Sequence, residues 1–144
     1  AGYLTQFRPG VRDIGALTPV DYDLLVDLGK RDLLVVFDYR RYQSDVVNFA
    51  RQAAGRGLAI LLFTDTWLSP IADFSDLTMA AEIDVNSPFD TLATSVAQME
   101  TVLAHFLAHS GAAARKRIEL IEHIRETNAV TLDGKGEKDA PPPR

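Results

Sequence analysis

The chain has 144 residues, with 47% apolar and 24% charged content and a formal net charge of −5. This length and composition are sufficient for the core of one globular domain, and they exclude fibrous and fully disordered classes. The negative charge argues against DNA binding by this segment alone, because nucleic-acid affinity comes largely from the neutralisation of phosphates by Lys and Arg.

The sequence contains no cysteine, which excludes disulfides, thiolate metal sites and thiol catalysis and suits a reducing cytoplasm. No apolar stretch approaches the roughly 20 residues of a membrane helix. The first residues, AGYLTQFRPGV, lack the basic-then-apolar layout of a signal peptide. We therefore expect a soluble, cytoplasmic protein without membrane contact.

The first elements in chain order are a short strand candidate at residues 11–14 and a helix at residues 20–28. Pro19 directly precedes this helix and suits its first turn. The opening residues 1–10 are typical of the last turns of a helix, so the start of the domain looks incomplete. A doubly wound sheet has one more strand there, and we expect that first strand to be missing.

A βαβ unit follows. Residues 32–38 (DLLVVFD) and 58–65 (LAILLFTD) are apolar runs bounded by charge, as expected of strands buried in a parallel sheet. Between them, residues 44–56 have apolar side chains at helical spacing and end at a Gly-Arg-Gly sequence. A strand, a helix and a strand in this order form a right-handed parallel crossover in almost all proteins.

The second half of the chain begins with a turn-rich connection at residues 68–76, which has room for one helical turn, and a more polar strand at residues 77–83. Two helices are predicted next, at residues 89–110 and 113–126. The first has one apolar face, which we interpret as core packing, with a partner-facing surface as the alternative. That face comprises Leu92, Val96, Met99, Val102, Leu103 and Phe106.

The predicted fold class is α/β: a three-layer αβα sandwich around a mainly parallel, doubly wound sheet. We expect one domain over residues 1–128. Residues 129–144 contain Gly, Pro and charged residues but few apolar ones, which predicts a disordered tail.

Ligands of open α/β sheets bind at the carboxyl ends of the strands, where loops lead into helix N-termini. Two such loops are visible, at residues 38–44 and 64–70. The first contains Asp38, Arg40 and Arg41 and no glycine. The second begins with Thr64 and Asp65, a pair that also suits ordinary turn and capping chemistry, and contains Trp67.

The stretch from Val35 to Asp76 resembles the second half of the sugar isomerase (SIS) domain. In that family a strand ends in a Ser-x-Ser-Gly-x-Thr phosphate loop, a helix ends in Arg-Gly, and a strand ends in Thr-Asp before a Ser-Pro-Leu-Ala-like segment. The last three marks appear here at matching spacing, as Arg56-Gly57, Thr64-Asp65 and Ser69-Pro70-Ile71-Ala72. The loop FDYRRYQ is similar to that of the SIS domain of RpiR-type bacterial transcriptional regulators.

The phosphate loop itself departs from the family pattern. The family's serines fall on Asp38 and Arg40, its glycine on Arg41 and its threonine on Gln43. An ionised aspartate donates no hydrogen bond to a phosphate, whereas the two arginines can attract one or hold a carboxylate in bidentate fashion. In the structural alternative, Asp38 pairs with one of these arginines and holds the loop or a subunit interface.

The ligand-binding residues that the resemblance and the loop together predict are Asp38, Arg40, Arg41, Gln43, Ser44 and Thr64. We predict no catalytic residue, no metal site and no cofactor. His105 and His109 lie one helical turn apart, but the Glu of an H-E-x-x-H motif is absent, so we interpret them as ordinary surface or core residues.

The resemblance implies an effector-sensing and dimerisation domain of a transcriptional regulator that binds a phosphosugar or a related anionic carbohydrate derivative. It also implies a homo-oligomer, either a dimer or a tetramer, and DNA contact only through an N-terminal helix-turn-helix domain outside this chain. The alternatives are a phosphosugar isomerase, which the altered phosphate loop disfavours, and an SIS scaffold that binds no ligand. The prediction is therefore a protein that is not an enzyme.

Overall fold

The computed structural model describes residues 2–128, which form two compact units. One is the sheet unit, Ile14–Thr101, and the other is the helical unit, made of the described residues before 14 and after 101. Helix α4 (Ala93–His109) begins in the sheet unit and ends in the helical unit. The candidate site lies entirely within the sheet unit.

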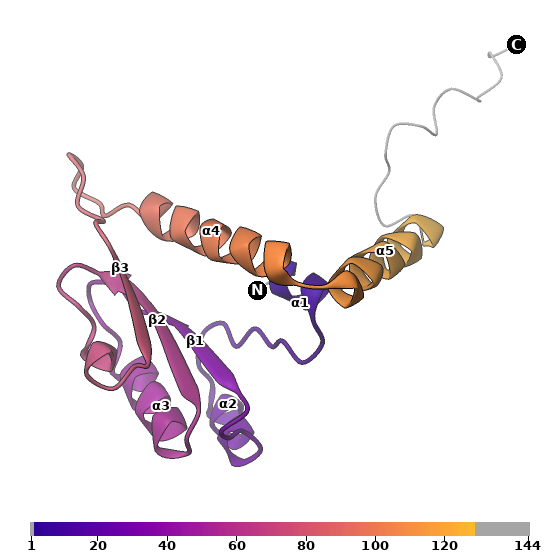
Figure 1. Ribbon diagram of the computed structural model, residues 1–144. Helices are drawn as coiled ribbons and strands as arrows, with labels where there is room; N and C mark the ends of the chain where they lie inside the picture. The colour runs from indigo at the N-terminus through magenta and orange to yellow at the C-terminus, as the bar shows by residue number, and fades with distance from the viewer. Residues whose placement is uncertain (1, 129–144) are drawn as a thin grey trace, which may run out of the picture. The chain divides into compact units, whose positions relative to one another are not determined.

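The sheet has three parallel strands in the order β1 (Leu33–Phe37), β2 (Ala59–Asp65) and β3 (Leu77–Ala81) (Figure 1). Their apolar runs suit a sheet that is covered rather than solvated. The central strand β2 is the most buried, with Ile60, Leu62 and Phe63 at most 1% exposed. The predicted βαβ unit and the α/β class are confirmed.

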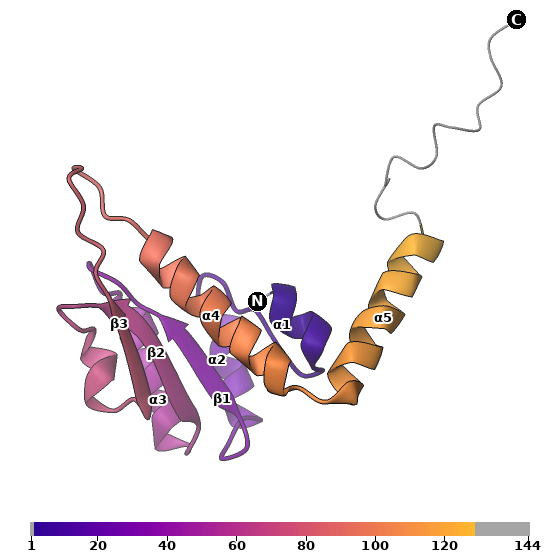
Figure 2. The same cartoon turned by 45° about the horizontal axis from the view of Figure 1, so that its top comes forward.

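One face of the sheet is covered by α2 (Pro19–Asp23), the 3₁₀ turn η1 (Leu24–Val26) and α3 (Ser44–Gly55), as Figure 2 shows from a second side. Phe49 of α3 belongs to the same buried core cluster as the strand residues Val36 and Leu62, and Tyr22 of α2 meets the Phe49 ring edge-on. Gly57, with a φ of +89°, ends the helix as the Gly-Arg-Gly sequence predicts. The core therefore holds α3 directly behind the loop that precedes it.

The predicted strand at residues 11–14 and the start of the predicted helix at residues 89–110 differ most from the structure. The predicted helix at residues 20–28 is the short α2 followed by η1, and β3 ends at Ala81 rather than at residue 83. Residues 11–14 form no strand, because they pair with none of the strands of the described sheet and an unpaired strand leaves its backbone groups unsatisfied. The predicted helix at residues 89–110 begins later, at Ala93, whose backbone N–H donates to the Thr91 hydroxyl. Such a capping contact favours a helix start at that point rather than at Phe89.

The interpretation of the α4 apolar face as core packing is contradicted at half of its six residues. Its side chains at Leu92, Val96 and Phe106 are 54%, 55% and 39% exposed. The other three residues of the face, Met99, Val102 and Leu103, are half-buried.

The helical unit contains α1 (Gly2–Phe7), the last turns of α4, and α5 (Ala112–Thr127). Within it, the Arg117 guanidinium donates to the backbone carbonyl of Thr5 at 3.1 Å. No helix in the described part of the chain has the length and apolar character to span a membrane. The predicted tail, residues 129–144, lies outside the described residues.

Candidate functional site

The carboxyl ends of β1 and β2 meet at one edge of the sheet because the two strands are parallel neighbours. The strand-end loop (residues 38–44) leaves β1 here, and its first residue stays beside β2, since the backbone N–H of Asp38 donates to the Phe63 carbonyl at 3.0 Å. The connection from β2 to η2 (Pro70–Asp73) returns to the same edge. Both predicted ligand loops therefore share one site.

Asp38 is buried and is bound to the connection after β2. The Ser69 hydroxyl donates to its Oδ2 at 2.5 Å, and the same hydroxyl accepts the backbone N–H of Ile71 at 3.2 Å. Asp38 thus joins the ends of two strands through Ser69. In this structure its side-chain partner is Ser69 rather than Arg40 or Arg41, which differs from the structural alternative considered above.

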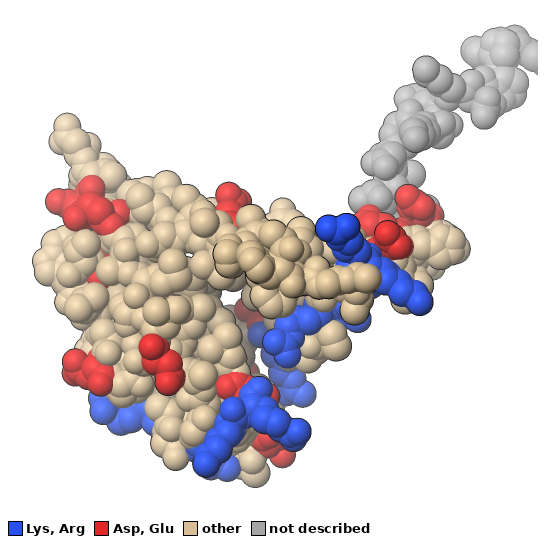
Figure 3. Space-filling view, viewed as in Figure 1, with Lys and Arg blue, Asp and Glu red and all other residues tan. Residues whose placement is uncertain are grey.

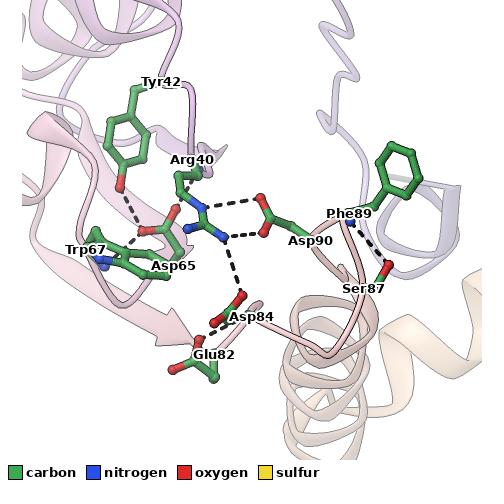
Figure 4. Close-up of polar contacts among 9 residues, drawn as sticks. All are labelled: Arg40, Tyr42, Asp65, Trp67, Glu82, Asp84, Ser87, Phe89 and Asp90. Atoms are coloured by element: carbon green, nitrogen blue, oxygen red, sulfur yellow. Dashed lines mark hydrogen bonds and ion pairs between the residues drawn. The ribbon is translucent and has the colours of Figure 1, made fainter.

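Asp65 lies fully buried in the middle of the site and binds three donors (Figure 4). Its Oδ2 accepts the backbone N–H of Arg40 at 2.5 Å. Its Oδ1 accepts the Tyr42 hydroxyl at 2.7 Å and the backbone N–H of Trp67 at 2.9 Å. The carboxylate therefore occupies loop amide groups of the kind that could otherwise donate to a bound anion.

Tyr42 acts in this site as a hydrogen-bond donor. Burial, followed by its hydrogen bond to Asp65, raises the pKa of Tyr42 to about 12. Its hydroxyl therefore keeps its proton at physiological pH and cannot serve as a general base there.

The Arg40 side chain extends from the loop over an aromatic ring. Its guanidinium carbon lies 4.1 Å from the centroid of the Trp67 ring. Asp90 binds the guanidinium through both carboxylate oxygens, with a 3.3 Å hydrogen bond from Nε and a second, close one from Nη2, and Asp84 lies 3.9 Å from Nη2. The hydrogen bond to Asp90 raises the pKa of Arg40 further above its ordinary value, so the group is always charged.

The two acidic partners of Arg40 come from the acidic segment (residues 84–90), which follows β3. Figure 3 shows acidic side chains gathered beside the carboxyl end of that strand. The segment reaches the same edge as the strand-end loop because β3 runs parallel to β2. Opposite charges from two different strand ends therefore meet at Arg40.

The remaining predicted residues have different surroundings. Gln43 and Ser44 are exposed at the start of α3, where the backbone carbonyl of Gln43 accepts the N–H of Val47. Thr64 is fully buried, and its hydroxyl accepts the backbone N–H of Ser69 at 3.1 Å. Ligand contact by these three residues stays a prediction.

Arg41 is exposed and adopts a left-handed backbone conformation, with a φ of +71°. This conformation costs an ordinary residue roughly 1–2 kcal/mol, and glycine adopts it freely. The position at which the family carries glycine therefore keeps a glycine-like backbone although its side chain has changed.

Arg41→Gly is expected to stabilise the protein slightly, by about 0.5 kcal/mol, because the relief of left-handed strain exceeds the greater flexibility of glycine in the unfolded chain. Urea denaturation followed by circular dichroism measures the change, with Arg41→Lys as a control of unchanged backbone preference. A clear destabilisation by glycine would show that the conformation is not strained.

The buried Asp38 carboxyl is expected to make the stability of the protein depend on pH. Burial raises the pKa of Asp38 above 3.8, although hydrogen bonds from the Ser69 hydroxyl and the Gln43 backbone N–H partly oppose this rise. The folded state therefore binds this proton more tightly than the unfolded state, so the group's contribution to stability falls as the pH rises from 3.8 through the folded pKa. A tenfold difference in the acid dissociation constant of a group between the folded and unfolded states corresponds to about 1.4 kcal/mol in the free energy of unfolding.

Asp38→Asn is expected to remove this loss, so the variant gains stability relative to the wild type as the pH rises from 4 to 7. Free energies of unfolding from urea titrations at several pH values measure the difference between the two proteins. Parallel pH curves would show that Asp38 titrates in the same way in the folded and unfolded chains.

Several residues of this site did not emerge as contacts from the sequence. Ser69 appeared only as a family mark, and Asp65 only as a family mark and as part of a turn. Asp84 and Asp90 were missed, although the spacing of three parallel strands places the segment after β3 at the same edge as the loop after β1. The signal that could have predicted this contact was the presence of two acidic residues after β3 and two arginines after β1.

The two histidines are close, with ring centroids 4.2 Å apart, and Nδ1 of His109 lies 2.8 Å from the His105 carbonyl oxygen. Among residues 2–128, no group of three or more His, Cys, Asp or Glu side chains has the arrangement of a metal site. The polar groups of the candidate site are instead bound to one another.

Comparison with known proteins supports the fold. The sugar isomerase domain of an RpiR transcription factor from Sphaerobacter thermophilus superposes with a TM-score of 0.75 at 21% identity, over 85% of this chain and 68% of that chain. A crystal structure described as a hypothetical protein superposes less closely, with a TM-score of 0.42 at 16% identity, over 90% of this chain and 62% of the other. No curated protein matches the sequence.

The family model of the SIS domain matches residues 13–109, which is more than half of the chain. This range contains the strand-end loop, all three strands and the acidic segment. The chain belongs to the SIS domain family.

Proposed function

We propose that this chain is the effector-sensing domain of an RpiR-like transcriptional regulator and that it binds an anionic carbohydrate derivative at the strand-end loop. Membership of the SIS family and the likeness to the RpiR sugar isomerase domain support a regulatory role connected with sugars. The ligand enters at the edge where the loops after β1 and β2 meet.

The observation that carries this proposal is the placement of Arg40. Its guanidinium is permanently charged, lies over Trp67 and already holds a carboxylate in bidentate fashion. A planar guanidinium presents paired donors that match a carboxylate, and an aromatic ring offers an apolar surface for the body of a sugar. Together they form a receptor for an acidic carbohydrate.

The same geometry disfavours phosphosugar isomerisation. That reaction needs a general base that reaches the substrate and a phosphate anchor. The two buried carboxylates of the site, Asp38 and Asp65, are engaged by Ser69 and by loop donors. Arg40 and Arg41 stand where the family has a serine and a glycine. We therefore propose a binding domain rather than an enzyme.

In the proposed regulator the domain acts in the cytoplasm as a dimer or tetramer, and a helix-turn-helix domain elsewhere in the protein contacts DNA. The exposed apolar side chains of α4, such as Val96, suit an interface between copies. A ligand then acts only through its different affinity for two arrangements of the subunits.

Thermal unfolding in the presence of three ligand classes tests the proposal. D-gluconate, D-glucose 6-phosphate and D-glucose are compared at equal concentration and ionic strength. We expect stabilisation by an anionic sugar and none by D-glucose, because ligand binding to the folded state raises its apparent stability. If neither anion raises the midpoint of unfolding, the sensing role is wrong. Turnover of D-glucose 6-phosphate would show that the protein is an enzyme instead.

A further inference from the structure

The acidic segment is held in place mainly through Arg40. Every residue from 84 to 90 is exposed, and Phe89 is 79% exposed. Its own hydrogen bonds are local, such as those from Ser87 N–H to the Val85 carbonyl and from Phe89 N–H to the Ser87 hydroxyl. Among the described residues, its hydrogen bonds and ion pairs to a distant part of the chain all go to Arg40.

Arg40 itself does not depend on the acidic segment for its position. Its backbone N–H is fixed by the buried carboxylate of Asp65, and its guanidinium rests on the Trp67 ring. The donor of the contact, Arg40, is therefore built into the sheet edge, whereas the accepting carboxylates belong to a surface segment in which every residue is exposed. An exposed ion pair of this kind contributes little to stability, so it can be exchanged.

We propose that Asp90 occupies the position on Arg40 that a ligand's carboxylate takes, so that the acidic segment blocks the site and is displaced when a sugar acid binds. This inference rests on the proposed function and specifies both its ligand class and its regulation. The tethered carboxylate competes through its high effective concentration near Arg40, and it lowers the apparent affinity for the free ligand.

The charge of the site favours a carboxylate over a phosphate. Replacement of Asp90 by a monoanionic carboxylate leaves the local charge unchanged, whereas a dianionic phosphate adds a negative charge near Asp65 and Asp84. The amide groups of Arg40 and Trp67 are already bound by Asp65 and give a phosphate no further donors. Phosphate binding at helix N-termini and loops depends on such free donors.

The acidic segment also leads directly into α4, which begins at Ala93. Its displacement changes the connection that precedes this helix, next to Thr91, whose backbone N–H donates to the Ile83 carbonyl at 2.9 Å. In this proposal, ligand binding is coupled to the start of α4 through this connection.

The test uses Asp90→Asn, with Asp23→Asn as a matched control, because Asp23 is exposed on α2 and its side chain has no hydrogen bond or ion pair in the described structure. Isothermal titration measures the affinity of each protein for D-gluconate and D-glucose 6-phosphate. We expect Asp90→Asn to bind D-gluconate roughly three- to sixfold more tightly than the wild type, Asp23→Asn to match the wild type, and D-glucose 6-phosphate to bind more weakly than D-gluconate.

A second readout needs no ligand. Trp67 is the only tryptophan in the sequence, and the Arg40 guanidinium covers its ring. We expect acrylamide to quench its fluorescence more strongly in Asp90→Asn than in the wild type, and added salt to reduce this difference.

The outcomes separate the two proposals. Binding of D-gluconate by the wild type that Asp90→Asn weakens or leaves unchanged overturns the blocking role of Asp90 and leaves the sensing function standing. Tighter binding of D-glucose 6-phosphate than of D-gluconate overturns the ligand class. If neither sugar binds to either protein, both proposals are wrong.

Discussion

Asp65→Ala is expected to lower the free energy of unfolding by about 3 kcal/mol. The carboxylate of Asp65 is fully buried and accepts from the backbone N–H of Arg40, the Tyr42 hydroxyl and the backbone N–H of Trp67. Alanine leaves these donors without their partner and opens a small cavity at the end of β2. Urea denaturation followed by circular dichroism measures the loss.

Asp65→Asn provides the matched control, since it keeps the shape of the side chain and one carbonyl oxygen. We expect a smaller loss, of about 1–2 kcal/mol, because one of the two acceptor atoms becomes a donor that faces other donors. Similar stability of both variants and the wild type would contradict the central position that the structure assigns to Asp65.

Arg40→Ala is expected to weaken the binding of an anionic sugar at least tenfold, while the stability of the unliganded protein hardly changes. The side chain is exposed, so its ion pairs contribute little to folding, whereas a bound carboxylate loses its bidentate partner. Isothermal titration with D-gluconate measures the affinity, and urea denaturation measures the stability of the same sample.

Arg51→Ala is the control for the change in net charge. Arg51 is also exposed and also lies over an aromatic ring, at 4.8 Å from the centroid of Phe74, but it belongs to α3 and not to the strand-end loop. Equal effects of the two substitutions on D-gluconate binding would attribute the attraction to overall charge and would remove Arg40 from its proposed role.

The parts of the fold that the sequence predicts well are those determined by local patterns. Buried parallel strands have continuous apolar runs, and β1 and β2 lie within a residue of the ranges expected from those runs. The end of α3 follows from Gly57, which adopts the left-handed conformation that stops helices. Such signals lie within a few residues of the structure that they specify.

The errors arise where a distant partner decides the outcome. Residues 11–14 have strand-like composition but pair with no strand in the described structure, and the apolar face of α4 stays exposed at Val96 although its spacing is that of a core helix. An apolar stripe identifies a surface that is able to be buried and does not identify what buries it.

In the candidate site, too, some features follow from local sequence patterns and others depend on distant partners. Its location at the carboxyl ends of the strands followed from topology, and Arg40 stood out as an arginine at a serine position. The partners of each charge did not follow, because Asp38 binds Ser69 from the next loop and Arg40 binds Asp90 from the segment after β3. These pairings depend on loop conformations that no local pattern in the sequence records.

A nitrogen–proton correlation spectrum recorded during a titration with D-gluconate tests the central claim most directly. The sequence has a single tryptophan, so the indole N–H resonance of Trp67 is unambiguous, and the Nε–H resonance of Arg40 is assigned by its loss in Arg40→Ala. We expect both resonances to move together and to saturate, while the Nε–H resonance of Arg51 stays in place. Unchanged positions of the Trp67 and Arg40 resonances at saturating D-gluconate and D-glucose 6-phosphate would contradict the account.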